Sequence, residues 1–88
     1  MSRLVPVDYD KVIKALFKIG YETSHQRGSH IVMRLANKER YASVFGEREP
    51  DSLIVVPSHR PVGKGMVRTI IREADLSVDE FNRLLATI

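Results

Sequence analysis

The sequence predicts an α+β fold in which helices pack on one face of a small antiparallel sheet. Two segments, one near each end of the chain, repeat apolar residues at about the 3.6-residue period of an amphipathic helix. Between them lie short runs that alternate apolar and polar residues or are wholly apolar, as strands do. A length of 88 residues leaves room for one hydrophobic core, so we expect residues 1–88 to form a single domain.

Composition and charge narrow the classes of function. The chain has no cysteine, which excludes disulfides, thiolate nucleophiles and cysteine-based zinc sites. The formal net charge of +3 favours a polyanionic partner without identifying it. No apolar run is long enough to cross a membrane and no signal peptide is visible, so we expect a cytoplasmic protein without a membrane partner.

The first helix is expected over residues 8–19. Its apolar positions follow the helical period and are Tyr9, Val12, Ile13, Leu16 and Ile19. Asp8 precedes them as an N-cap whose carboxylate can accept the free N–H groups of the first turn. Gly20 follows as a stop, because glycine tolerates the left-handed conformation that often ends a helix.

Two strands joined by a tight turn are predicted next. Residues 21–27 are interpreted as a polar strand, and residues 26–29 as a turn in which Gly28 takes a positive φ. The second strand covers residues 29–36 and alternates, so its two faces can be assigned. The stronger apolar set is expected to face the core and consists of Ile31, Met33 and Leu35. The more open face then carries His30, Val32 and Arg34.

The middle of the chain, from residue 37 to residue 51, is charged and rich in turn residues. Within it, residues 41–45 are predicted to form one extra short strand. Residues 53–56 are a continuous apolar run that Pro57 ends, which predicts a buried strand. The expected order is therefore helix, three or more strands, helix, helix.

Two helices are expected after a loop over residues 58–65. The first is amphipathic, and its apolar face is formed by Val67, Ile70, Ile71 and Ala74. Three basic residues spaced by four form one stripe if that helix begins early, and they are Lys64, Arg68 and Arg72. Ser77 and Glu80 form a capping box for a last short helix, whose apolar residues are Phe81, Leu84, Leu85 and Ile88.

The stretch with the most chemistry is Gly28-Ser29-His30, at the mouth of a predicted strand. Histidine can both accept and donate a proton near neutral pH, so His30 is the candidate catalytic residue. Each residue also has a simpler interpretation. Gly28 meets the requirement of a turn, Ser29 closes that turn with its hydroxyl, and His30 caps the strand by hydrogen bonding.

Four motifs follow one another along nearly the whole chain: Gly20-Tyr21, Gln26-Arg27-Gly28-Ser29-His30, Val55-Val56-Pro57-Ser58-His59 and Gly65-Met66-Val67-Arg68-Thr69-Ile70-Ile71-Arg72-Glu73-Ala74. Together they resemble the HicA/YcfA-like toxins, which are small bacterial mRNA interferases. The resemblance implies an α-β-β-β-α fold like that of the double-stranded-RNA-binding domain. It also implies cleavage of RNA (mRNA), a catalytic histidine at the position of His30, and a HicB-like antitoxin as partner.

The sequence departs from this family's pattern at several places. His25 stands where the family usually has arginine, which removes or alters one expected phosphate contact. Met66 replaces the usual threonine before Val67, and Asp75 replaces the usual glycine after Ala74. The stretch over residues 37–51 is also longer than is common in the family.

The resemblance assigns roles to residues of this sequence. His30 would remove the proton from the 2′-hydroxyl of RNA, whose oxygen attacks the neighbouring phosphorus, and this route uses no metal or cofactor. The candidate RNA contacts, among them arginines that suit phosphate through paired donors, are Arg27, Gly28, Ser29, Arg34, Lys64, Arg68 and Arg72. For the stripe of Lys64, Arg68 and Arg72 this role is read from the residues themselves, and its alternative is a solvated helix face with Glu73 and Asp75 nearby. His59 is the candidate for a second proton transfer and His25 has less support, since a solvated histidine explains either. The spacings of the histidines are not those of a zinc site.

Two other functions compete with an endoribonuclease toxin. The chain could be a non-catalytic RNA-binding module of the same fold, because a basic stripe and few aromatic residues suit recognition of the RNA backbone in either case. It could also be a protein-interaction domain that binds no RNA. The first alternative differs from the enzyme in whether His30 accelerates cleavage, and the second in whether RNA is bound at all.

Overall fold

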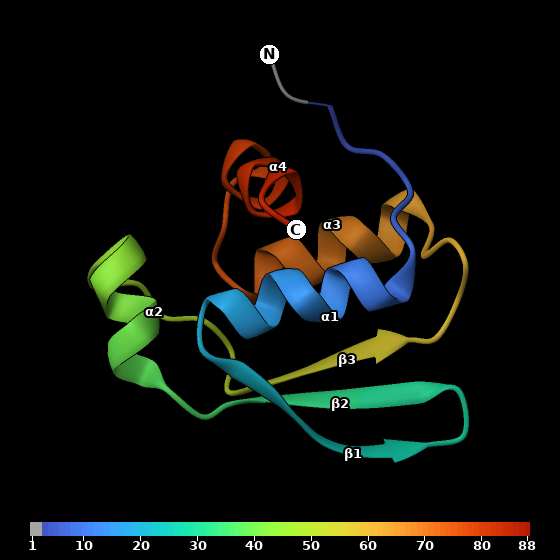
Figure 1. Ribbon diagram of the computed structural model, residues 1–88, viewed down its shortest axis with the longest axis horizontal. Helices are drawn as coiled ribbons and strands as arrows, with labels where there is room; N and C mark the ends of the chain where they lie inside the picture. Colours follow the sequence, from blue (N-terminus) through green and yellow to red (C-terminus); the bar gives the residue numbers. More distant parts are fainter. Residues whose placement is uncertain (1–2) are drawn as a thin grey trace.

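The computed structural model describes residues 3–88, which form one sheet, two helices that cover it and two further helices (Figure 1). In chain order the elements are α1 (Tyr9–Lys18), β1 (Tyr21–Arg27), β2 (His30–Leu35), α2 (Lys38–Phe45), β3 (Leu53–Pro57), α3 (Lys64–Glu73) and α4 (Val78–Ala86). The strands are antiparallel in the order β1-β2-β3. This is the α+β class that the sequence predicts, with one unexpected helix.

The hydrophobic core lies between the sheet and the helices on one of its faces. The sheet contributes Ile31, Met33, Leu35, Ile54 and Val56. The apolar faces of α1 and α3 lie against them and bury Val12, Leu16, Val67 and Ile70. Figure 1 shows α4 on the far side of α1 and α3 from the sheet, where it buries Phe81. Since all these helices cover the same face, the other face of the sheet is open, as predicted.

Both ends of α1 are close to the predicted positions, but the N-cap works differently. The Asp8 side chain makes no capping hydrogen bond. Its backbone carbonyl instead accepts the N–H groups of Lys11 and Val12, at 3.0 and 3.2 Å. At the other end Gly20 has a φ of 110°, and a Cβ at this position would collide with the backbone carbonyl of Asn37. The chain therefore needs glycine at this position both for its conformation and for space.

The segment over residues 41–45 is helical, which corrects the prediction of an extra strand. Asn37 caps α2, because its side chain accepts the N–H of Arg40 at 2.9 Å. Tyr41 is only 2% exposed, and its hydroxyl donates to the carbonyl of Ala74 at 2.5 Å. Burial raises the pKa of Tyr41 to about 12, so the hydroxyl keeps the proton that it donates. A contact 33 residues away in sequence thus holds α2 in place.

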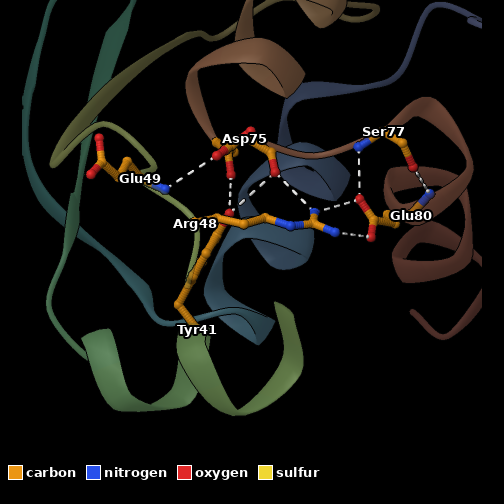
Figure 2. Close-up of polar contacts among 7 residues, drawn as sticks. Tyr41, Arg48, Glu49, Asp75, Ser77 and Glu80 are labelled. Carbon is orange, nitrogen blue, oxygen red and sulfur yellow. Dashed lines mark hydrogen bonds and ion pairs between the residues drawn. The ribbon is translucent and has the colours of Figure 1, made fainter. Parts of the chain in front are cut away.

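The chain after α2 is fastened to the connection between α3 and α4 (Figure 2). Arg48 donates to both carboxylate oxygens of Glu80, at 2.7 and 2.8 Å, and to the carbonyl of Asp75 at 3.0 Å. The N–H of Glu49 donates to the Asp75 carboxylate at 3.1 Å. Asp75 has a φ of 56°, in the left-handed region that aspartate enters more readily than most residues. We call these contacts of Arg48, Glu49, Asp75 and Glu80 the clasp.

Two further predictions concern the C-terminal half of the chain. The capping box at the start of α4 is confirmed, since the Ser77 hydroxyl accepts the N–H of Glu80 and the Glu80 carboxylate accepts the N–H of Ser77. The strand predicted as buried is only half buried. In β3 the side chains of Leu53 and Val55 are 53% and 42% exposed, because they lie on the open face of the sheet.

No helix within residues 3–88 is long and apolar enough to span a membrane.

Candidate active site around His30

His30 is the first residue of β2 and lies at the turn end of the sheet. Gly28 and Ser29 form the two-residue loop between Arg27 and His30, which are paired across β1 and β2. Gly28 has a φ of 57°, and glycine at the first position of such a loop is the requirement of a type II′ hairpin turn. This confirms the predicted turn. The His30 side chain is exposed, and the strand pairing sets it opposite Arg27.

A β-bulge decides which residues of β1 share the open face with His30. The register shifts between Thr23 and His25, so Ser24 is an extra residue on β1. Thr23 pairs with the core residue Met33, whereas His25 pairs with Val32 on the open face. Without the extra residue, His25 and Arg27 would have the same parity as Thr23 and would point to the helix side. The bulge therefore brings His25 and Arg27 to the face that carries His30.

Arg34 lies on the same open face, at the other end of β2, where it is exposed and pairs with Glu22 of β1. The two strands thus present an open surface along which Arg27, His25 and Arg34 follow one another from the turn end to the other end of the hairpin. The sequence predicted His30 and Arg34 on one face, and the structure confirms that placement. Their relation to Arg27 depends on the pairing of β1 with β2.

The loop that carries His59 lies next to the turn of the hairpin. Pro57 pairs with His30 across β2 and β3, and the N–H of Ser58 donates to the carbonyl of Ser29 at 2.7 Å. His59 follows directly, is exposed, and is held through its backbone by Tyr9, whose N–H donates to its carbonyl at 3.2 Å. The structure thus places His59 two residues beyond the cross-strand neighbour of His30. Within residues 3–88, no three histidine, aspartate or glutamate side chains gather as potential metal ligands.

A cavity of about 230 Å³ opens beside His30, along edge strand β3 and α3. Its lining consists of His30, Leu53, Val55, Pro57, Met66, Thr69 and Glu73. Sequence reasoning found His30 and missed the others. A signal was present for Met66, which lies outside the apolar stripe of α3 and is 42% exposed. None was present for Leu53 and Val55, because a continuous apolar run does not reveal which side of an edge strand is uncovered.

The basic stripe of Lys64, Arg68 and Arg72 does form on α3, which begins at Lys64, and all three side chains are exposed. It does not line the cavity beside His30. Successive residues are about 100° apart around a helix, so Met66, Thr69 and Glu73 cluster on one side of α3 and the stripe on another. The core residues of α3 form a third face, which separates Met66 from Lys64 around the helix. The structure therefore separates the stripe from the other candidate RNA contacts.

A larger cavity, of about 420 Å³, lies at α2 and includes Leu35, Tyr41 and Arg48 in its lining. In this cavity Arg48 is paired with Glu80, and the Tyr41 hydroxyl donates a hydrogen bond to the carbonyl of Ala74. These two groups hold the fold together through contacts within the chain. The exposed imidazole of His30 marks the smaller cavity as the candidate active site.

Comparison with protein families gives one finding. Residues 9–76 match the family described as the HicA toxin of bacterial toxin–antitoxin systems. The match begins with α1, covers all three strands and α3, and ends before α4. Neither the comparison with curated proteins nor that with solved structures gave a match. Because the matched residues make up most of the chain and include the whole sheet, the protein belongs to the HicA toxin family.

Proposed function

We propose that this toxin is an endoribonuclease that cleaves mRNA, with His30 as its general base. The observation that carries the proposal is the position of His30. It is exposed at the end of the sheet, opposite Arg27 and directly after the Gly28-Ser29 turn. In such a pair, the guanidinium can bind a phosphate of the RNA. The imidazole can then take a proton from the hydroxyl next to that phosphate. Membership of a toxin–antitoxin family agrees with an activity that must be held in check.

The proposed reaction is an attack within the RNA strand. His30 accepts the proton of a 2′-hydroxyl, and the 2′-oxygen forms a bond to the adjacent phosphorus. The bond from phosphorus to the 5′-oxygen of the next nucleotide breaks, and that oxygen takes up a proton. We propose His59 as the donor of this proton, because the loop that carries His59 is hydrogen-bonded to the Ser29 carbonyl through the N–H of Ser58. The chemistry restricts the substrate to RNA, since DNA has no 2′-hydroxyl.

Contacts to the RNA backbone are proposed on two surfaces. The first is the open sheet face around His30, with Arg27, Arg34 and the Gly28-Ser29 turn. The second is the stripe of Lys64, Arg68 and Arg72 on α3, which only an RNA long enough to leave the sheet face would reach. Charge on the transition state would be stabilised by the first surface, because it adjoins the reacting phosphate.

The test is cleavage of a labelled RNA by the purified chain in EDTA. We expect His30→Ala to slow cleavage by about 10²- to 10⁴-fold, the usual contribution of a general acid–base group. The variant should stay folded, because the His30 side chain is exposed. Lys14→Ala, an exposed change on α1, serves as the control and should leave the rate unchanged. An RNA with a single 2′-deoxy nucleotide should resist cleavage at that position.

Each outcome separates the candidate functions. A folded His30→Ala protein that cleaves RNA as fast as the intact chain would remove His30 from the mechanism. An intact chain that binds RNA but does not cleave it would indicate a non-catalytic RNA-binding module. Binding of neither RNA nor its cleavage products, even at low salt, would indicate a protein-interaction domain.

A further inference from the structure

His30 lies on the boundary between two unlike halves of the open surface. On the side of β1 its neighbours are cationic or can become so, namely Arg27 and His25. On the side of β3 and α3 its neighbours are apolar: Leu53, Val55 and Met66 are 53%, 42% and 42% exposed. An RNA nucleotide is divided in the same way, into an anionic phosphate and an uncharged, planar base.

The apolar half is unsuited to phosphate. No lysine or arginine lines the cavity beside His30, and its one carboxylate belongs to Glu73. Neither salt bridge found within residues 3–88 involves Glu73, so no cation there neutralises this carboxylate. A phosphate drawn into the cavity would lose water and meet a negative charge. An uncharged group that offers N–H donors fits this lining better than a phosphate does.

The cavity has two distinct ends. The carbonyl of Glu73 accepts the N–H of Asp51 at 2.7 Å, which places Glu73 near the start of β3. His30 pairs with Pro57 at the end of β3, roughly 13 Å away by the rise of a strand. Figure 1 shows α3 running back along β3, so Met66, near its first turn, lies toward the His30 end. Val55 lies between these two ends. We call the apolar side chains of Leu53, Val55 and Met66 the floor of the cavity.

We propose that this cavity seats the base of a nucleotide next to the cleaved phosphate, and that Glu73 selects guanine. The proposal rests on the proposed endoribonuclease function and adds the specificity of the same site. The base packs on Val55 and on Met66, whose polarizable sulfur makes favourable contacts with aromatic rings. The phosphate remains on the other side of His30, near Arg27.

Guanine is selected because of its hydrogen-bonding edge. In single-stranded RNA the Watson–Crick edge of a base is free to be recognised. Guanine carries two neighbouring donors on that edge, N1–H and the N2 amino group. A carboxylate accepts a pair of parallel N–H bonds, whereas the other bases offer it only one donor site on that edge. Glu73 is thus a specificity-determining residue at the far end of the floor.

The first experiment measures kcat/KM for short RNAs that differ at one position, with guanosine or inosine. Inosine lacks only the N2 amino group. We expect the intact chain to prefer guanosine by about tenfold, the scale of a lost bidentate contact. Glu73→Gln should remove most of this preference, because an amide cannot accept both bonds. Glu39→Gln, an exposed change on α2, should keep it.

The second experiment tests the apolar floor. Val55→Thr keeps the shape of the side chain and adds a hydroxyl, and Met66→Ala removes the thioether. Both should raise KM for every RNA with little change in kcat, because they weaken seating of the base and leave His30 intact. Val44→Thr on α2, where the valine is 56% exposed, is the matched control and should change neither constant. Thermal melting confirms that each variant is folded.

Failure of this proposal can be told from failure of the proposed function. If the intact chain cleaves RNA and neither Glu73→Gln nor the floor variants alter base preference or KM, the cavity does not seat a base. If no RNA is cleaved, the same variants are measured for binding to an RNA with a 2′-deoxy nucleotide at the cleavage position. A guanosine preference in that binding supports the cavity assignment, and its absence overturns it. Variants that weaken only antitoxin binding would make the cavity a protein site.

Discussion

Gly28 and Gly20 both have a positive φ, yet they differ in what surrounds them. Around Gly28 there is open space, so a Cβ would meet nothing within 4 Å. Around Gly20 the carbonyl of Asn37 occupies the place of a Cβ. Gly28 is therefore required by backbone conformation alone, and Gly20 by conformation and by packing. The distinction matters because Gly28 sets the hairpin that presents His30.

This difference leads to a prediction about two matched substitutions. Gly28→Ala should lower the free energy of unfolding by about 1–2 kcal/mol, the cost of placing an L-residue in the left-handed region. Gly20→Ala should lower it by more, because the backbone of Asn37 must also move. Urea denaturation of both variants measures the difference. Equal losses, or a greater loss at Gly28, would contradict the assigned causes.

Asp75 shows how one residue can combine a backbone role with a side-chain role. Its φ of 56° is unusual for a residue other than glycine. Aspartate accepts this conformation and adds a carboxylate that binds the N–H of Glu49. Asp75 is thus a member of the clasp. It does not line the cavity at His30.

Among the elements, α2 owes its position to the clasp and to Tyr41. The Arg48 guanidinium beside Glu80 lowers the pKa of that carboxyl from 4.5 to about 2, and hydrogen bonds from Ser77 add to the effect. A carboxyl whose pKa is lower in the folded state stabilises the fold only while it is ionised. Its contribution is present above the unfolded pKa of about 4.5 and is lost as the pH falls toward 2.

The clasp therefore predicts an acid-sensitive stability. Between pH 4.5 and pH 2 the intact chain should lose stability, and Glu80→Gln should lose less over the same interval, starting from a lower value at neutral pH. Asp79→Asn, in the same first turn of α4, is the control and should keep the pH dependence of the intact chain. Thermal melting at a series of pH values checks this. Parallel curves for the intact chain and Glu80→Gln would exclude Glu80 as the cause.

For the whole molecule, the two cationic surfaces predict two different salt responses. With a short RNA that covers only the sheet face, Arg27→Ala or Arg34→Ala should make the dependence of log K on log salt shallower by about 0.7. Arg68→Ala should have this effect only with a longer RNA, because the stripe lies on another face of α3. Arg83→Ala on α4 is the control. An effect of Arg68→Ala on the shortest RNA would place the stripe in the main site.

Family membership implies an antitoxin partner, and we propose a HicB-like protein that covers the open face. Acidic groups of such a partner would pair with Arg27 or Arg34 in place of phosphate. Its association rate should fall as salt rises, since this attraction is screened over a Debye length of about 10 Å at 0.1 M. Purification of the tagged chain from its native host tests the proposal. Recovery of the chain alone, or with a partner that leaves RNA cleavage undiminished, would contradict it.

Local patterns in the sequence determined much of the fold. The helical period sets the buried face of α1 and α3, and the alternation in residues 29–36 sets the two faces of β2. Gly28 determines the turn, and Ser77 with Glu80 determines the start of α4. These features follow from contacts between residues a few positions apart, which a local pattern records. His30 and Arg34 could be placed on one accessible surface for the same reason.

Only the tertiary structure decided the rest, because the contacts responsible join distant parts of the chain. Residues 41–45 are helical although a strand was predicted: the Asn37 cap is a local signal, but the burial of Tyr41 depends on the distant carbonyl of Ala74. The bulge at Ser24 depends on pairing with β2, and no local pattern shows that pairing. Whether Val55 is buried depends on which face of the sheet the helices cover, and that face carries Ile54 and Val56 instead. The cavity beside His30 is formed by those long-range contacts, so its lining was not visible in the sequence.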